Sequence, residues 1–350
     1  MAGPVPQDGK WLERQAVTAR TQQYYSKVLD RLLPLLNAQQ VSFLDAPRVD
    51  EIITAVLQEM YFEGLDGGEG TRVLAAWAHE FPEYGRHGTL SLPHASRAAR
   101  AFKRLAPARS RGPIPLSLAV ATSMAAFHRK QFRQGVGMLL MFVCYLRPSE
   151  LLTLLGRHVM RPVTQLLGAG AGAVPSLLVR PFEGEGSRPT KVGEFDDSVP
   201  LDAPYLQELN VVLLRLQGQT DPNRPLFPFS YVEFKECFEQ CLLDASLADL
   251  NLTLYSFRHG GPSHDRALGF RNLEAIAKRG RWMTMASVRR YEKAARIQYV
   301  LNQTPAVGQR YAAACMEVIG QVLLGNRAPL PPPSVASQSS SLGAGGSTRR

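Results

Sequence analysis

The chain has 350 residues, of which 40 are Lys or Arg and 30 are Asp or Glu, so its formal net charge is +10. Its length suits two domains better than one, and its 45% of hydrophobic residues is ordinary for a globular protein with a buried core. The basic balance favours a polyanionic partner, of which nucleic acid is the commonest, although a simple drift in composition toward Arg gives the same charge.

Simple sequence features disfavour several other classes of protein. The four cysteines form no CxxC pair, so we expect buried, reduced thiols and no zinc site. The segment MAGPVPQDGKWLERQ lacks the apolar run of a signal peptide. The longest apolar stretch, around Val136 to Leu146, is too short to span a bilayer. We therefore expect a soluble intracellular protein.

The first part of the chain shows helical patterns after a loose arm at residues 1–12. Apolar residues at helical spacing predict a helix from Thr18 onward. Further helices are expected at 49–58, after the glycine-rich segment GLDGGEGT, and at 96–105. That segment lacks the Lys-Ser or Lys-Thr of a P-loop, so we interpret its glycines as a loop. Residues 1–105 are thus predicted to form a small, all-helical domain.

A basic linker at residues 106–117 separates this domain from a second one at 118–325, because its prolines and glycine cannot continue a helix. In the second domain, 177–179 and 198–201 predict two short strands on either side of a turn-rich segment. The predicted helices lie at 116–127, 133–145, from Pro148, and at 204–217, 231–247, 263–268, 271–279, 284–294 and 307–324. The Pro-, Ser- and Gly-rich tail at 326–350 is expected to be disordered. The predicted fold class is mainly α, with a small antiparallel β-sheet.

Three segments of the second domain carry side chains suited to phosphate chemistry. Arg147 begins a predicted helix in CYLRPSELLTL, and Tyr255 and Arg258 lie in LTLYSFRHGGPSHDRALG. Trp282 and Tyr291 lie in KRGRWMTMASVRRYEKA. Each residue taken alone fits an ordinary helix-terminal arginine or core tyrosine. Together they fit phosphodiester transfer without a metal, which needs an oxygen nucleophile, charge at the phosphate and an acid for the leaving oxygen.

In their order and spacing these segments resemble the motifs of the tyrosine recombinases, a family that includes phage integrases and Xer-type recombinases. Arg147 matches the first arginine box, Arg258 matches the arginine of the second box, and His259 matches the histidine beside it. Trp282 stands at the family's His-or-Trp position, nine residues before Tyr291, which matches the nucleophile. The segment TKVGEFDDSVPL resembles the hairpin that carries the family's catalytic lysine, here Lys191.

One departure from the family pattern concerns Tyr255, which stands where the family usually has a His. A neutral tyrosine can hydrogen-bond a phosphate, but it brings no positive charge, so slow or lost catalysis becomes a serious alternative. The resemblance covers residues 118–295. For 14–105 it extends only to the helical character of the family's core-binding domain.

The resemblance implies a core-binding-like domain and a catalytic domain that close around double-stranded DNA as a homotetramer on two duplexes. Tyr291 would cleave a strand, form a 3′-phosphotyrosyl intermediate and religate it to a new 5′-hydroxyl. Lys191 would protonate the leaving oxygen. The covalent bond conserves the energy, so no cofactor or metal is implied. The expected function is site-specific recombination or integration in the nucleus, with the helix at 307–324 as an exchange element between protomers.

Further DNA contacts are predicted from arginines outside the motifs. Arg97, Arg100 and Arg104 fall on one face of a predicted helix and suit phosphate oxygens, although a solvated basic face is the alternative. Arg281 lies beside Trp282 in a cluster of basic residues and is a fourth candidate.

Three other functions remain open from the sequence. A decayed relative would bind DNA without cutting it, as Tyr255 suggests. A type IB topoisomerase-like relaxase would share the arginines and the nucleophile but act as a monomer. A helical protein scaffold would leave the ordered set of motifs unexplained.

Overall fold

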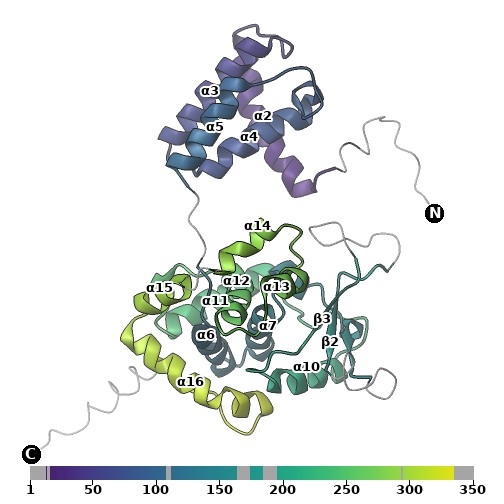
Figure 1. Ribbon diagram of the computed structural model, residues 1–350, viewed down its shortest axis with the longest axis vertical. Helices are drawn as coiled ribbons and strands as arrows, with labels where there is room; N and C mark the ends of the chain where they lie inside the picture. Colours follow the sequence, from purple (N-terminus) through teal and green to yellow (C-terminus); the bar gives the residue numbers. More distant parts are fainter. Residues whose placement is uncertain are drawn as a thin grey trace, which may run out of the picture. The chain divides into compact units, whose positions relative to one another are not determined.

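The computed structural model describes residues 13, 16–107, 112–163, 174–183, 195–292 and 295–334. The chain divides into two compact units, Met1–Ser110 and Arg111–Arg350 (Figure 1). Both units are mainly helical and one small antiparallel sheet lies in the second, so the predicted fold class is confirmed. Lys191 lies outside the described residues, as do the last 16 residues of the predicted disordered tail, 335–350.

The N-terminal unit is built from helices that bury one apolar face each. Its described elements are α2 (Ala19–Ala38), α3 (Ala46–Phe62), α4 (Gly67–Glu80), the short 3-10 turn η1 (Pro82–Tyr84) and α5 (Pro93–Leu105). Side chains of Thr18, Asp45 and Asp66 accept backbone hydrogen bonds at the starts of α2, α3 and α4, which satisfies amides that the first turn leaves unpaired. Trp77 is completely buried at the centre of the unit's core.

The glycine-rich segment is a turn only at Gly64–Asp66, where Gly64 has φ = 78°, so the loop prediction is wrong for the residues from Gly67 onward. Helix α4 begins at Gly67, immediately after its cap Asp66. A Cβ atom at Gly67 would lie 2.3 Å from the Cα atom of Lys103 on α5. Gly67 is therefore required for the close approach of α4 and α5. This packing explains why a glycine-rich sequence, which usually favours a turn, begins a helix here.

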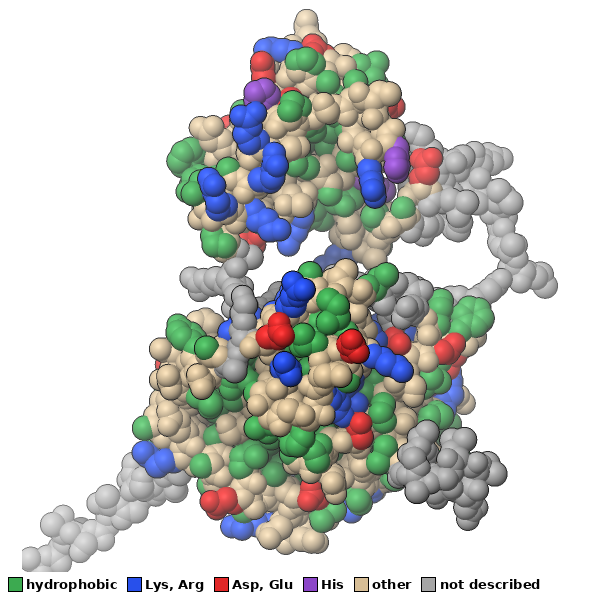
Figure 2. Space-filling view, viewed as in Figure 1, with side chains coloured by type: hydrophobic (Ala, Val, Ile, Leu, Met, Phe, Trp, Pro, Cys, Tyr) green, Lys and Arg blue, Asp and Glu red, His purple; other side chains and the backbone are tan. Residues whose placement is uncertain are grey.

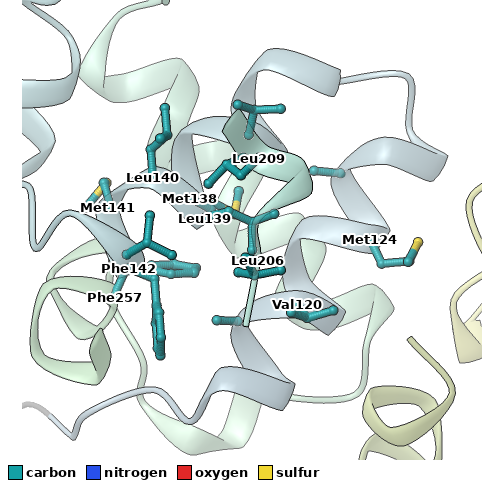
Figure 3. Close-up of a cluster of buried hydrophobic side chains, with 14 of the residues drawn as sticks. Val120, Met124, Met138, Leu139, Leu140, Met141, Phe142, Leu206, Leu209 and Phe257 are labelled. Atoms are coloured by element: carbon teal, nitrogen blue, oxygen red, sulfur yellow. The ribbon is translucent and has the colours of Figure 1, made fainter. Parts of the chain in front are cut away.

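The C-terminal unit packs its helices around one large apolar core. Its described helices are α6 (Leu116–His128), α7 (Phe132–Val143), α8 (Pro148–Leu151), α10 (Glu208–Gly218), α11 (Tyr231–Asp244), α12 (Leu254–Ala267), α13 (Leu273–Gly280), α14 (Met285–Val288), α15 (Ala295–Gln303) and α16 (Ala306–Leu324), with 3-10 turns η2 (Gly156–His158), η3 (Ala248–Leu250) and η4 (Arg289–Glu292). Consecutive residues Met138 to Phe142 of α7 are all buried, and Figure 3 shows them among Val120, Leu206 and Phe257. Such burial on every side places α7 at the centre of the unit.

A small sheet lies beside these helices. Strands β2 (Ser176–Val179) and β3 (Asp197–Pro200) pair antiparallel, with Leu177 opposite Val199, as the two predicted strands require. Strand β1 (Val159–Met160) adds a third, unpredicted strand on the other side of β2. Leu177, Val179 and Val199 are buried, so alternate residues attach the sheet to the core.

Helix α12 begins nine residues before the helix predicted at 263–268, and it runs through the Gly-Gly-Pro segment at residues 260–262. A Cβ atom at Gly260 would lie 2.2 Å from the carbonyl oxygen of Ile114, and one at Gly261 would lie 2.0 Å from that of Phe142. The two glycines allow α12 to touch neighbouring backbone directly. Arg258 and His259 are consequently held inside a packed helix.

Helix α16 packs against its own chain. Tyr311, Cys315, Val318 and Leu323 are buried in the core of the C-terminal unit, on the face that was expected to exchange between protomers. Residues 326–334, assigned above to the disordered tail, also lie against this unit, where the carbonyl of Leu330 accepts a hydrogen bond from the hydroxyl of Tyr311. The apolar face of α16 is thus covered within one chain.

Candidate active site

A buried carboxylate, Glu150, brings three arginines together in the C-terminal unit. Arg147 caps α8 and donates to Glu150 twice, from its backbone N–H at 2.8 Å and from Nη1 at 2.5 Å. Arg281 Nη2 donates to Oε2 at 2.6 Å, and Arg258 Nη1 lies 3.5 Å from the same oxygen. Burial alone would raise the pKa of Glu150, but the three guanidinium groups lower it below its ordinary value. Glu150 is therefore ionised at neutral pH and neutralises part of the surrounding charge.

Arg258 projects from α12 and ties three segments of the backbone together. Its Nη1 donates to the carbonyl of Tyr145, and its Nη2 donates to the carbonyl of Gly280 at 2.5 Å. The Trp282 ring covers the guanidinium, with its centre 4.7 Å from the carbon Cζ. Burial lowers the pKa of Arg258 to about 9, which leaves the group charged at neutral pH. Only 3% of the side chain is exposed, so this arginine is an internal charge in the described structure.

Tyr291 lies in η4, next to these arginines. Its ring centre is 5.0 Å from that of Trp282, and its hydroxyl oxygen is 3.1 Å from Nδ1 of His259. Burial raises the pKa of Tyr291 to about 12, although the nearby charges of Arg258 and Arg290 act in the opposite direction. The phenol is therefore protonated at neutral pH, and it needs a base before it can act as a nucleophile.

Arg281, expected above to contact DNA, has only 1% of its side chain exposed. It ends α13 in the left-handed conformation with φ = 56°, a region that favours glycine. From there its guanidinium contacts Glu150, and its Nε lies 3.8 Å from a carboxylate oxygen of Asp197 at the start of β3. The left-handed turn thus directs the Arg281 side chain into the interior of the unit. There it contacts the carboxylate of Glu150 instead of extending into solvent.

A second buried carboxylate supports the backbone that Arg258 contacts. Asp265 on α12 is completely buried and accepts hydrogen bonds from the hydroxyls of Tyr145 at 2.5 Å and Tyr205 at 2.8 Å. Arg271 completes the set with an Nη1–Oδ2 distance of 2.5 Å. Burial and the Asp265 charge raise the pKa of both tyrosines. Tyr145, which has φ = 52°, is therefore held firmly where its carbonyl meets Arg258.

The structure brings together Arg147, Arg258, Trp282 and Tyr291 from the predicted site. Tyr255 is half-buried on α12, one helical turn before His259. The part that sequence reasoning missed is the contact of His259 with Tyr291. Its position directly after Arg258 was visible in the sequence, but the partner lies 32 residues further along the chain.

The arginines predicted to contact DNA from the first domain lie on α5, whose two faces differ sharply. The side chains of Ala95, Ala99 and Phe102 are buried in the core of the N-terminal unit. The opposite face exposes Arg97, Arg100, Lys103 and Arg104. Figure 2 shows Lys and Arg side chains gathered on one side of this unit. No ion pair among the described residues involves Arg97, Arg100 or Arg104, so their positive charge is presented to solvent.

No group of three or more His, Cys, Asp or Glu side chains among the described residues is placed to hold a metal ion. None of the described helices is both long enough and apolar enough to cross a membrane.

The chain was also compared with known proteins. No protein-family model matches it, and no curated protein matches it. Among solved structures, it is similar to a crystal structure of XerA recombinase, with 15% sequence identity and a TM-score of 0.35 over 80% of this chain and 99% of that chain.

Proposed function

We propose that this protein is a tyrosine-type DNA strand transferase of the site-specific recombinase kind, with Tyr291 as its nucleophile. The observation that carries the proposal is the meeting of Arg147, Arg258 and the Tyr291 hydroxyl at one place, from segments that lie far apart in the sequence. Charged guanidinium groups beside a phenol suit attack on a phosphate, because they stabilise the charge that develops there.

Each residue of the site has a distinct part in this reaction. Arg147, with 14% of its side chain exposed, is the arginine best placed to receive a phosphate oxygen. Arg258 adds positive charge from the interior of the unit and packs against the ring of Trp282. Tyr291 attacks the phosphorus, the bond to the 5′-oxygen breaks, and a 3′-phosphotyrosyl bond forms. Lys191 is proposed as the acid that protonates the leaving 5′-oxygen.

Cleavage requires that DNA open this site, because only 3% of Tyr291 is exposed. The segment from Trp282 to Glu292 is suited to such a shift, since it has few buried anchors apart from Val288 and Tyr291 itself. Met283 and Met285 in the same segment are 75% and 41% exposed. We propose that binding of a phosphate at Arg147 moves this segment and exposes the hydroxyl.

Double-stranded DNA is the proposed partner, and a homotetramer is the proposed assembly during strand exchange. The exposed arginines of α5 supply contacts to the DNA backbone, which do not depend on base sequence. A relaxation assay on supercoiled DNA separates recombination from a topoisomerase-like activity, because only the latter removes supercoils as a monomer.

The decisive experiment uses a nicked suicide substrate, from which the short cleaved fragment diffuses away so that religation fails. The wild-type chain should accumulate a denaturant-resistant protein–DNA adduct, and Tyr291→Phe should abolish it while DNA binding persists. Tyr299→Phe is the matched control, because that tyrosine is 67% exposed and lies outside the site. An adduct that persists in Tyr291→Phe and disappears in Tyr299→Phe would move the nucleophile to Tyr299.

A second candidate function is DNA binding without cleavage. The buried hydroxyl of Tyr291 and the presence of Tyr255 in place of a His favour it. In that case the wild type binds DNA but forms no adduct. Restored trapping in Tyr255→His would then identify the protein as a recombinase relative that has lost its activity at this position.

The role of Lys191 has its own test. Lys191→Ala should slow cleavage of ordinary DNA but have little effect on a substrate whose leaving 5′-oxygen is replaced by sulfur, because a thiolate leaves without a proton. An equal loss on both substrates would remove Lys191 from the acid role.

A further inference from the structure

The hydroxyl of Tyr291 lies within hydrogen-bond distance of His259, a residue to which the predicted site gave no catalytic role. The hydroxyl oxygen lies 3.1 Å from Nδ1 of His259, within the 2.6–3.2 Å range typical of a base and the proton it removes. The two ring centres are 6.1 Å apart. Because His259 lies inside the packed helix α12, its ring is attached to a fixed backbone.

The Tyr291 phenol needs help to lose its proton. With a pKa of about 12, only about one molecule in 10⁵ carries a phenolate at pH 7. The surrounding Arg147 and Arg258 have no atoms that accept a proton, and the Trp282 indole is a donor only. Glu150 is already engaged with three arginines. His259 is the acceptor that the described geometry provides.

On the basis of the proposed function, we propose that His259 is a catalytic residue, the general base that removes the proton from Tyr291 during strand cleavage. The Tyr291 oxygen forms the bond to phosphorus with its own electron pair, and its proton passes to Nδ1. The bond between phosphorus and the 5′-oxygen breaks, and that oxygen keeps the electron pair and takes up a proton from water or a general acid. In religation the imidazolium returns its proton to the departing tyrosine.

The direction of the hydrogen bond defines the reactive form of the histidine. For the phenol to donate to Nδ1, the ring must be neutral and carry its hydrogen on Nε2, and this is the tautomer that the proposal requires. The positive charge that develops on His259 lies beside the phosphate and helps to balance it in the transition state. One imidazole thus supplies both the base and an additional charge.

The first test compares two substitutions on the same helix in single-turnover cleavage by the full-length chain. His259→Asn keeps a polar group near the position of Nδ1 but cannot take up a proton. It should slow adduct formation by about 10²- to 10⁴-fold and leave DNA affinity unchanged. His264→Asn is the matched control, since His264 also lies on α12 but contacts the rings of Phe142 and Tyr205, and its cleavage rate should stay near that of the wild type.

A second measurement separates a base from a merely structural histidine. Replacing Tyr291 with a ring-fluorinated tyrosine makes the phenol more acidic, so the reaction depends less on a base. Fluorination should raise the rate of His259→Asn much more than that of the wild type. His259→Asn should also lose the same factor on the 5′-sulfur substrate, because the base acts on the nucleophile and not on the leaving group.

The outcomes distinguish this inference from the proposed function. A wild-type chain that forms an adduct while His259→Asn cleaves equally fast overturns the role of His259 and leaves the proposed function standing. Equal acceleration of both proteins by fluorination also overturns it. A wild-type chain that forms no adduct on any substrate overturns both.

Discussion

The exposed arginines of α5 in the N-terminal unit and the buried arginines around Glu150 in the C-terminal unit share a residue type but have different surroundings. Arg97 and Arg104 extend into solvent from a helix whose other face is apolar. Arg258 and Arg281 have 3% and 1% of their side chains exposed, and they contact a carboxylate and backbone carbonyls. Exposed charge is available to an anionic partner, whereas buried charge organises the backbone around Tyr291.

This comparison predicts its largest effect on stability at Glu150. Glu150→Gln would leave the charges of three arginines without their carboxylate, which costs about 3–5 kcal/mol of the free energy of unfolding. Denaturant unfolding of the full chain, followed through tryptophan fluorescence, measures the loss. The control is Glu51→Gln on α3, which breaks an exposed ion pair with Arg48 and should cost less than about 1 kcal/mol. Equal losses in both variants would show that burial does not separate the two kinds of charge.

A smaller effect on stability is expected at Arg281. Its left-handed backbone destabilises the folded chain, whereas its buried ion pair with Glu150 stabilises it. Arg281→Ala loses the contact with Glu150 and keeps the strained conformation with φ = 56°. Arg281→Gly loses the same contact but relieves the strain, so it should be more stable than the Ala variant by about 1–2 kcal/mol. Thermal unfolding of the two variants gives this difference directly. A Gly variant less stable than the Ala variant would contradict it.

Acid should weaken the buried cluster at Glu150. The pKa of this group is lower in the folded chain than its ordinary value of 4.5, so the unfolded chain binds its proton first. The resulting stability is fully present above the ordinary value and is lost as the pH falls through the lower, folded value. Wild-type stability should therefore drop more steeply below pH 4.5 than that of Glu150→Gln, as measured by denaturant unfolding at a series of pH values. Parallel curves would exclude Glu150 as a source of acid sensitivity.

The sequence predicted the helical class and the two paired strands, because these depend on local periodicity, and motif spacing selected Arg147, Arg258, Trp282 and Tyr291, which lie close together. It failed where close packing decides the outcome. Gly67 belongs to a segment predicted to be a loop, and Gly260 and Gly261 precede the helix predicted at 263–268. Each of these glycines instead lies in a helix that touches another segment's backbone. The inward direction of Arg281 depends on a single positive φ angle, and the contact of His259 depends on a turn 32 residues away, so neither has a local signature.

The smallest effect on stability, and the clearest effect on DNA binding, is expected on α5. Replacing Arg97, Arg100 and Arg104 together by Ala removes exposed charges and should change the free energy of unfolding by less than about 0.5 kcal/mol at each position. If each arginine neutralises one DNA phosphate, the slope of log affinity against log salt should fall by about 0.9 per residue, or about 2.7 in all.

Fluorescence titration of a DNA duplex at several salt concentrations measures this slope. The matched control replaces three arginines with no assigned contact to DNA or to the site, Arg215, Arg224 and Arg310, by Ala, which lowers the net charge equally. Long-range attraction alone would weaken both triple variants alike, since it depends on the total charge. A loss of slope confined to the α5 variant would instead require direct phosphate contacts from this helix. An unchanged slope in the α5 variant would exclude this face from the DNA interface.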